Sequence, residues 1–128
     1  MVDSLLIKKI KIYTPFKGYL QALEGDLLIE DGKITNIDAS INKPAQLILK
    51  EKGLSLLPGF IDSHVHFRNP GLSHKETWQS AGRAALAGGV TTACDMPNTN
   101  PATITQTLLD EKLTIAKEEC PIDVFGYI

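Results

Sequence analysis

Cysteine is scarce, since Cys94 and Cys120 are the only two in the 128 residues. They do not have the close spacing of metal-binding cysteine pairs, so we interpret both as small core residues. The N-terminus also shows no signal-peptide pattern, because Lys8, Lys9 and Lys11 interrupt its apolar residues. Two thiols without such a leader predict a reducing compartment, and we expect a cytoplasmic protein.

Long apolar runs and an excess of one charge are also missing. No run reaches the roughly 18 apolar residues that a membrane span requires. Thirteen basic and fifteen acidic residues give a net charge of −2, with no block of like charges. Such a balance provides no footprint for nucleic acid or for a membrane surface. The composition, 43% hydrophobic and 22% charged, is that of a soluble chain with one core, and we expect no polymeric partner.

Residues 1–55 have strand patterns and no residues that indicate catalysis. Alternation of apolar and polar residues predicts half-buried strands, and Asp31-Gly32 is a typical hairpin turn. The expected strands cover residues 5–13, 26–29, 33–37 and 47–49. We therefore expect a small antiparallel β-sheet domain over residues 1–55.

A strand with chemically active side chains follows Pro58-Gly59. Because side chains alternate along a strand, two sets of residues face opposite ways. The polar set is Asp62, His64, His66 and Arg68, and the apolar set is Ile61, Val65 and Phe67. If the strand belongs to a parallel barrel, the apolar set packs under helices and the polar set faces the interior. Buried histidines and an arginine would need partners there, such as a metal and an anion.

A helix is expected after this strand. Ser73 and Glu76 have the spacing of a capping box, which predicts a helix that runs to about residue 87. We assign Trp78 to the core. Gly82 would allow this helix to approach a sheet closely.

Strand, helix and strand patterns then alternate to the end of the sequence. Residues 90–96 form the next expected strand, and Thr103 with Gln106 offers a second capping box for a helix to about residue 119. Its apolar stripe is Ile104, Leu108, Leu109, Leu113 and Ala116. Residues 122–128 form the last expected strand. This order is typical of an α/β fold with parallel strands and right-handed crossovers.

The expected architecture is the start of a (β/α)₈ TIM barrel, over residues 56–128, preceded by the small sheet domain. The pattern supplies about two and a half of the eight repeats of such a barrel. A full barrel takes about 250 residues, so we expect the chain to be the N-terminal part of a larger protein.

The two histidines at i and i+2 could converge on one metal ion, because neutral imidazole is the commonest ligand of zinc. Taken alone, a His-x-His pair is more often solvated or satisfied in a core. Asp62 lies about 6 to 7 Å from His64 along the strand, which indicates a supporting role and no direct metal bond. His74 is expected at the surface and is not a candidate ligand.

Two stretches carry a resemblance to a known family. They are Pro58-Gly59-Phe60-Ile61-Asp62-Ser63-His64-Val65-His66-Phe67-Arg68 and Asp95-Met96-Pro97-Asn98-Thr99-Asn100-Pro101. The first resembles the amidohydrolase superfamily as a whole. Arg68 after the second histidine, together with the Met-Pro-Asn-Thr run, is similar to the dihydroorotases within it.

That resemblance implies a site. His64 and His66 would bind zinc in a one-metal or two-metal centre, with further ligands from later strands. Arg68 and Asn98 would bind the carboxylate of the substrate, which suits the planar guanidinium fork and the amide. The general base would be a carboxylate beyond Ile128, so no catalytic base is expected in this chain.

The resemblance also implies a reaction, the reversible hydrolysis of dihydroorotate to N-carbamoyl-L-aspartate in pyrimidine biosynthesis. The 128 residues alone would be inactive. We expect a homo-oligomer, with aspartate carbamoyltransferase as a further partner, and a small sheet completed by the C-terminal end of the full-length chain.

Two alternatives stay open. One is a related cyclic amidohydrolase, an allantoinase or a dihydropyrimidinase, against which Arg68 and the residues 96–98 argue. The other is a non-catalytic dihydroorotase-like subunit that supports aspartate carbamoyltransferase. Loss of the metal histidines would favour this second alternative, and both histidines are present.

Overall fold

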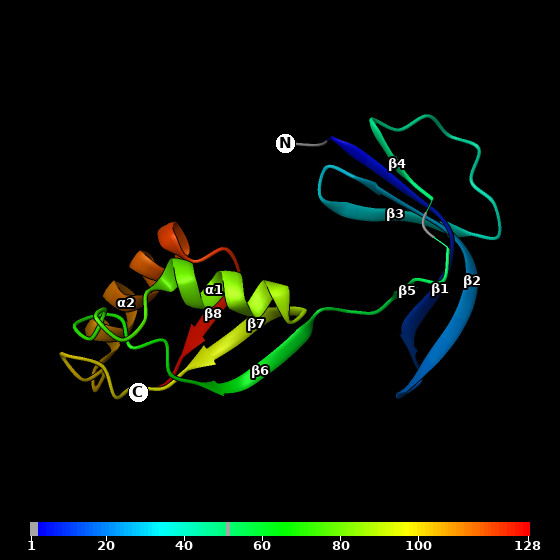
Figure 1. Ribbon diagram of the computed structural model, residues 1–128. Helices are drawn as coiled ribbons and strands as arrows, with labels where there is room; N and C mark the ends of the chain where they lie inside the picture. The colour runs from blue at the N-terminus through cyan, green and yellow to red at the C-terminus, as the bar shows by residue number, and fades with distance from the viewer. Residues whose placement is uncertain (1–2, 51) are drawn as a thin grey trace. The chain divides into compact units, whose positions relative to one another are not determined.

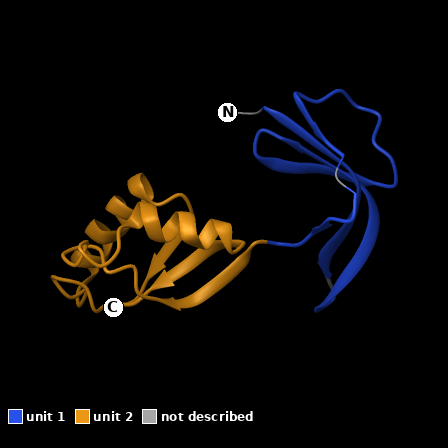
Figure 2. Ribbon diagram, in the orientation of Figure 1, with its two compact units in different colours: residues 1–58 blue, residues 59–128 orange. Residues whose placement is uncertain are grey.

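The structure is a computed structural model that describes residues 3–50 and 52–128. The chain divides into two compact units, Met1–Pro58 and Gly59–Ile128, which are coloured separately in Figure 2. In the described part of the chain, no helix has both the length and the apolar character needed to cross a membrane.

Unit 1 is a five-stranded sheet (Figure 1). Its strands are β1 (Ser4–Phe16), β2 (Tyr19–Glu30), β3 (Lys33–Asp38), β4 (Leu47–Leu49) and β5 (Ser55–Leu56). The order is β3-β2-β1-β4, with β5 also paired to β1. The pairs β1/β2 and β2/β3 are antiparallel, whereas β4 and β5 run parallel to β1. The prediction of a wholly antiparallel sheet is therefore wrong, because β4 follows a longer connection and no tight turn reverses it.

Two short turns create the antiparallel part of this sheet. Asp31 and Gly32 have φ of 50° and 72°, the left-handed values that a type I′ hairpin turn requires. This confirms the predicted hairpin. Lys17 and Gly18 have φ of 48° and 85° and join β1 to β2 in the same way. That second hairpin was not predicted, and it explains why both strands are longer than their apolar patterns indicate.

A buried carboxylate holds a bulge in β1. Asp26 is 1% exposed, and its two oxygens accept hydrogen bonds from the backbone N–H groups of Lys9 and Ile41, both at 2.9 Å. Lys9 has a φ of 54° at the point where the β1/β2 register shifts, and Lys8 Nζ lies 3.3 Å from Asp26. Burial alone would raise the pKa of Asp26. The two amides and the Lys8 ammonium outweigh burial and lower that pKa below its ordinary value.

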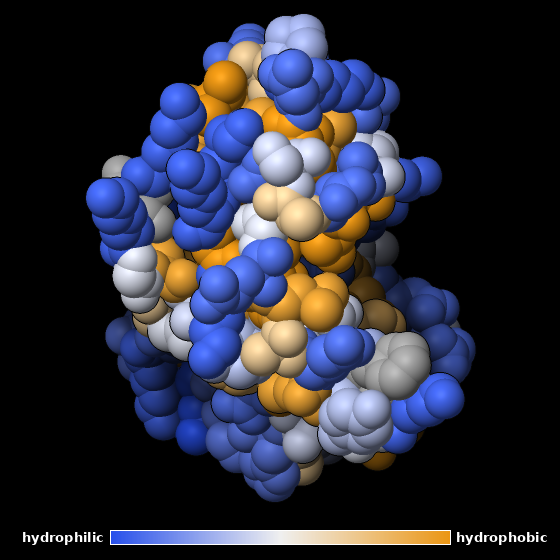
Figure 3. Space-filling view, turned by 90° about the vertical axis from the view of Figure 1, so that its right-hand side faces the viewer, coloured by the Kyte–Doolittle hydropathy of each residue, from blue (hydrophilic) through white to orange (hydrophobic). Residues whose placement is uncertain are grey.

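Unit 1 also leaves apolar side chains at its surface. Among those on β3 and β4, Ile34 is 60% exposed and Ile48 is 43% exposed. Figure 3 shows apolar side chains among polar ones on the face turned toward the viewer.

Unit 2 is a parallel three-stranded sheet with helices in the connections (Figure 1). Its elements are β6 (Phe60–Val65), α1 (Trp78–Ala87), β7 (Val90–Asp95), α2 (Gln106–Glu119) and β8 (Asp123–Gly126). Both helices pack against the sheet and against each other, which places them on one side of it. This confirms the predicted strand and helix order and the parallel pairing. The strand that carries the histidines is shorter than expected and ends at Val65.

The core of unit 2 lies between the sheet and the helices. Its buried members are Phe67, Trp78, Ala81, Ala93, Ala116 and Ile122. Trp78 is 0% exposed, which confirms its assignment to the core, and its ring meets Phe67 edge to face at 5.2 Å. Ile61 of the predicted apolar face is 70% exposed, so neither of the described helices of unit 2 covers that end of β6.

Both helices begin later than the predicted caps. The N-cap of α1 is Thr77, which forms a capping box with Ser80 in place of Ser73 with Glu76. The residues before Thr77 form turns. In one of them the Leu72 amide donates a hydrogen bond to the Arg68 carbonyl.

The N-cap of α2 is Thr105, whose side chain accepts from the amide of Leu108. Thr103 was the predicted cap, but it is buried and its hydroxyl bonds to that of Thr99 at 3.0 Å. Ile104, expected in the apolar stripe, lies before the helix and is 70% exposed.

Gly82 lies in a close contact, though not against the sheet. A Cβ at Gly82 would meet Cys120 Sγ at 2.8 Å and Pro121 Cδ at 2.4 Å. The small residue therefore allows α1 to approach the segment after α2.

Candidate active site

The carboxyl ends of β6 and β7 lie side by side and carry most of the predicted site residues. The Met96 amide donates to the Val65 carbonyl at 2.9 Å, which joins the two strand ends. His64 lies within β6 and His66 follows it directly, while Asn98 follows β7. Side chains from the end of β6 and from the segments after β6 and β7 therefore meet at one edge of the sheet, the usual location of sites in parallel α/β sheets.

The two imidazoles lie next to each other. The ring centroids of His64 and His66 are 5.4 Å apart with an interplanar angle of 70°. This proximity follows the i, i+2 spacing on an extended backbone, as the sequence predicted. Asp62 accepts a hydrogen bond from the His64 amide at 3.1 Å, in the stretch where the β6/β7 register shifts. Asp62 thus contacts the backbone of the histidine pair.

Asn98 contacts His66. The His66 Nδ1 atom lies 2.8 Å from Asn98 Oδ1. In the neutral ring, an Nδ1–H that donates to this carbonyl oxygen leaves the lone pair on Nε2. A ring nitrogen with this lone pair is the form that binds a metal, and such second-nitrogen contacts orient metal-binding histidines. The Asn98 amide nitrogen is not used in this contact.

Arg68 does not continue the strand alternation. The strand ends at Val65, and Arg68 has a φ of 64°, in the left-handed region. The expectation that Arg68 shares a strand face with the histidines is therefore wrong in its geometry, because period-2 alternation applies only to extended backbone. Arg68 is half-buried, and among the described residues its guanidinium has no ion-pair partner within 4.0 Å.

The segments after Arg68 and after Asn98 pack tightly together. The Asn100 amide donates to the Pro70 carbonyl at 3.1 Å. Gly71 has a φ of 82° and lies against the Asn100 backbone so closely that a Cβ would clash with it. The two loops that carry the candidate substrate residues are thereby joined.

A buried ion pair lies beneath these loops, and the sequence analysis missed it. Lys112 Nζ lies 2.5 Å from Asp95 Oδ2, and both side chains are 0% exposed. Lys112 also donates to the Met96 carbonyl at 3.0 Å, and Asp95 Oδ1 accepts from the Phe67 amide at 2.7 Å. A lysine between Leu108 and Ala116 of the predicted apolar stripe was the signal that could have indicated it.

Tyr127 is a second residue that the sequence analysis missed. Its hydroxyl donates to the Ser63 carbonyl at 3.0 Å, and its amide donates to the Asp95 carbonyl at 3.1 Å. The side chain therefore contacts the irregular part of β6 next to His64. An aromatic residue directly after β8 was the available signal.

The remaining titratable candidates lie elsewhere. His74 is exposed, as expected. Cys94 and Cys120 are half-buried free thiols, and burial raises the pKa of Cys120 above its ordinary value. No group of three or more His, Cys, Asp or Glu side chains suited to a metal ion occurs in residues 3–50 and 52–128.

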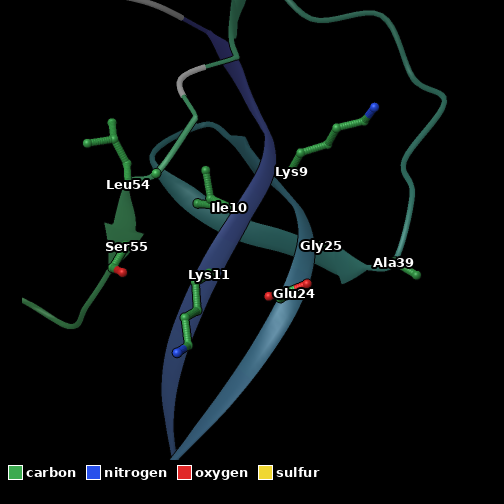
Figure 4. A pocket seen from close by; sticks show the side chains of 9 residues that line it. Lys9, Ile10, Lys11, Glu24, Gly25, Ala39, Leu54 and Ser55 are labelled. Atoms are coloured by element: carbon green, nitrogen blue, oxygen red, sulfur yellow. The ribbon is translucent and has the colours of Figure 1, made fainter.

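A separate pocket lies in unit 1 beside the β1 bulge (Figure 4). Its lining includes Lys9, Lys11, Glu24 and Leu54. The side chains of both signs come from β1 and β2, and Ile10 and Leu54 add apolar surface. It contains none of the predicted site residues.

Comparison with known proteins identifies the family. The model of the amidohydrolase family matches residues 55–127, more than half of the chain. The chain belongs to the amidohydrolase family. This assignment agrees with the resemblance carried by the His-x-His motif.

Curated relatives narrow the similarity. Over 126 residues the chain is 42% identical to dihydroorotase from Lactococcus lactis, covering 98% of this chain and 29% of that protein. It is 39% identical over 126 residues to dihydroorotase from Methanosarcina mazei, covering 98% of this chain and 26% of the relative. Dihydroorotase from Aquifex aeolicus is 54% identical over 83 residues, which cover 63% of this chain and 20% of the relative. The chain thus spans less than a third of the length of these relatives.

Two solved structures of similar fold are hydantoinases by name. The L-hydantoinase (dihydropyrimidinase) from Arthrobacter aurescens matches with a TM-score of 0.85 and 28% identity, covering 99% of this chain and 28% of that chain. A D-hydantoinase (dihydropyrimidinase) from Thermus matches with a TM-score of 0.70 and 27% identity, covering 97% and 27% of the two chains.

Proposed function

We propose that this chain is the N-terminal part of a zinc-dependent dihydroorotase and forms the first two and a half repeats of its (β/α)₈ barrel. The observation that carries the proposal is the pair of adjacent imidazoles at the end of β6, one of them held by Asn98 from the next loop. The similarity to curated dihydroorotases over 98% of the chain supports it.

The donor set fits a zinc ion. In its neutral form His66 would present the Nε2 lone pair, because its Nδ1 contacts Asn98 Oδ1, and the ring centroids of His64 and His66 are 5.4 Å apart. A catalytic zinc usually has three protein ligands and a water. This chain would supply two ligands, and later barrel strands would supply the others. One or two ions could then occupy the centre.

Bound zinc would polarise the amide carbonyl of the substrate and lower the pKa of a coordinated water towards about 7. The residues of this chain would orient the substrate. Arg68 would pair with the carboxylate of dihydroorotate, and the free Asn98 amide nitrogen would donate to the same group. The general base would come from beyond Ile128.

The proposal extends to the setting of the enzyme. Dihydroorotate hydrolysis would place it in pyrimidine biosynthesis, and two free thiols suit a cytoplasmic location. Exposed apolar residues on β3 and β4 suit a sheet completed by further strands of a full-length chain. A homo-oligomer, and association with aspartate carbamoyltransferase, remain part of the proposal.

A hydantoinase or dihydropyrimidinase activity is the second candidate, favoured by the TM-score of 0.85 to such an enzyme. The substrates of the two candidate activities differ. Dihydroorotate carries a carboxylate on its ring, whereas dihydrouracil, the substrate considered for the second candidate, does not. A carboxylate gives Arg68 and Asn98 a charged partner, so we favour dihydroorotate. A non-catalytic subunit is disfavoured, because both histidines are retained.

The test compares three histidine variants of the whole protein that contains this chain. We expect His64→Asn and His66→Asn each to lower zinc content and to reduce dihydroorotate hydrolysis by more than about 100-fold, since outer contacts alone cost about 10- to 100-fold. His74→Asn is the matched control, because His74 is exposed and is the remaining histidine of the three in the sequence.

Unchanged zinc content and turnover in both variants would contradict the metal site. Hydrolysis of dihydrouracil or hydantoin in preference to dihydroorotate would favour the second candidate.

A further inference from the structure

The strand ends beneath the site are connected by one set of buried polar contacts. Asp95 is the last residue of β7, and its Oδ1 accepts from the amide of Phe67, which follows His66. The Met96 amide donates to the carbonyl of Val65, which precedes His66. The backbone on both sides of His66 is therefore bonded to two successive residues at the end of β7.

Lys112 of α2 fixes these two residues from the helix side. Its ammonium lies 2.5 Å from Asp95 Oδ2 and donates to the Met96 carbonyl at 3.0 Å. Both charged side chains are 0% exposed. A buried ion pair contributes little net stability compared with apolar residues of similar volume, whereas removing one partner leaves a costly unpaired charge. Stability alone therefore gives a weak reason for an ion pair at this position.

The two residues whose backbone the Lys112–Asp95 pair contacts, Phe67 and Met96, lie near the site residues in the sequence. Met96 is two residues before Asn98, and Phe67 lies between His66 and Arg68. The contact from Asn98 Oδ1 to His66 Nδ1 depends on the relative placement of these two loops. Small displacements of such groups have large effects on metal binding and catalysis.

We propose that the buried Lys112–Asp95 pair is a positioning device that sets the relative placement of His66 and Asn98. This rests on the proposed function only in taking His66 as a metal ligand and Asn98 as a substrate contact. Lys112 and Asp95 would touch neither the metal nor the substrate.

The test uses the whole protein with Lys112→Met, Asp95→Asn and the neutral double variant. We expect each single change to lower thermal stability and the double variant to recover most of it, because no unpaired buried charge remains. All three should bind zinc about 10- to 100-fold more weakly in competition with a chelator. Lys117→Met is the matched control, since Lys117 is exposed on the same helix, and it should behave as the parent protein.

A second measurement does not depend on zinc or activity. In metal-free protein labelled with ¹⁵N-histidine, the ring nitrogen signal of His66 should report the Nδ1–H tautomer in the parent and in Lys117→Met. Its assignment comes from its loss in His66→Gln. We expect this signal to move toward the Nε2–H tautomer in the double variant, because the contact to Asn98 is loosened.

The results separate structure from positioning. A double variant that binds zinc like the parent and keeps the His66 signal would overturn the proposal and leave the pair a structural one. If the single variants do not fold, the neutral double variant decides. If the parent binds no zinc, the proposed function fails, and the His66 signal alone still decides whether the pair positions this residue.

Discussion

Arg68 combines a left-handed backbone with a guanidinium that has no ion-pair partner among the described residues. Its left-handed φ of 64° places it outside the strand, and no described residue provides an ion-pair partner. A left-handed backbone at a residue other than glycine is uncommon and concentrates at functional positions. Both features agree with the proposed role of Arg68 in binding a substrate carboxylate.

Replacing Arg68 by methionine should therefore affect substrate and leave the metal in place. In the whole protein we expect Arg68→Met to raise KM for dihydroorotate and to lower kcat/KM by about 10- to 150-fold, the equivalent of losing a charged hydrogen-bond pair of about 1.5 to 3 kcal/mol. Zinc content should stay near normal. Arg83→Met, on the exposed side of α1, is the control. An unchanged kcat/KM in Arg68→Met would remove Arg68 from the site.

Among the elements, the β1 bulge depends on one carboxylate. Asp26 holds the amides of Lys9 and Ile41, and its pKa in the folded protein is lowered from 3.8. A carboxyl group with a lowered folded pKa stabilises the fold above its unfolded pKa, and this stabilisation is lost as the pH falls through the folded value. The contribution should thus be complete at pH 7, begin to fall near pH 3.8 and disappear as the pH passes through the lower folded pKa.

Asp26→Asn tests how much the carboxylate stabilises unit 1. We expect it to lower the free energy of unfolding at pH 7 by about 1 to 3 kcal/mol, because buried amides lose a charged acceptor. The difference from the parent should shrink at pH 3, as measured by urea denaturation at both values. Glu24→Gln, an exposed carboxylate change on the same strand, should have little effect at either pH. An equal loss of stability at pH 3 and pH 7 would contradict the electrostatic explanation.

The periodic elements of unit 2 and their parallel pairing were predictable from the sequence, whereas the starts of both helices and the direction of β4 were not. Alternation and helical spacing identified β6, β7, α1 and α2, because those patterns reflect which side chains are buried. Thr103 failed as a cap because a tertiary contact to Thr99 takes its hydroxyl, which no local pattern records. The direction of β4 failed for the same reason, since strand pairing depends on distant residues.

The candidate site was predictable in part. The histidine pair and Asn98 were predicted from local spacing and from motifs that resemble those of a known family. The Lys112–Asp95 pair joins residues on different elements, and a lysine in an apolar stripe looks like a solvated position until the partner is known. The charge of Lys112 is compatible with burial because the Asp95 carboxylate lies 2.5 Å away and the Met96 carbonyl accepts a hydrogen bond from the same ammonium.

For the molecule as a whole, the described residues leave the parallel sheet with two free edges. β6 and β8 each pair only with β7, and Ile61 and Phe125 at these strands are 70% and 56% exposed. Open strand edges and exposed apolar residues favour association with further strands. The chain also spans at most 29% of the curated relatives that are aligned above.

We therefore expect residues 1–128 alone to be catalytically inactive. Two histidines on one strand should bind zinc weakly, because a catalytic site usually has three protein ligands. The measurement is dihydroorotate hydrolysis with added zinc, for residues 1–128 beside the whole protein at equal concentration. Turnover within about tenfold of the whole protein, a difference below about 1.4 kcal/mol in activation free energy, would show that the missing ligands are not required.

The two hairpins of unit 1 and the parallel strands of unit 2 differ in the sequence distance between paired residues. Phe16 pairs with Tyr19 and Glu30 with Lys33, whereas Phe60 pairs with Val90 and Ala93 with Val124. Chain segments that are close in sequence meet in about 1 to 10 μs, and distant ones must first pay the entropy of closing a long loop. During synthesis on a ribosome, the β1-β2-β3 meander can therefore form as soon as it emerges. The strand β6, which leads into the histidine pair, can pair with β7 only after α1 and β7 have been synthesised.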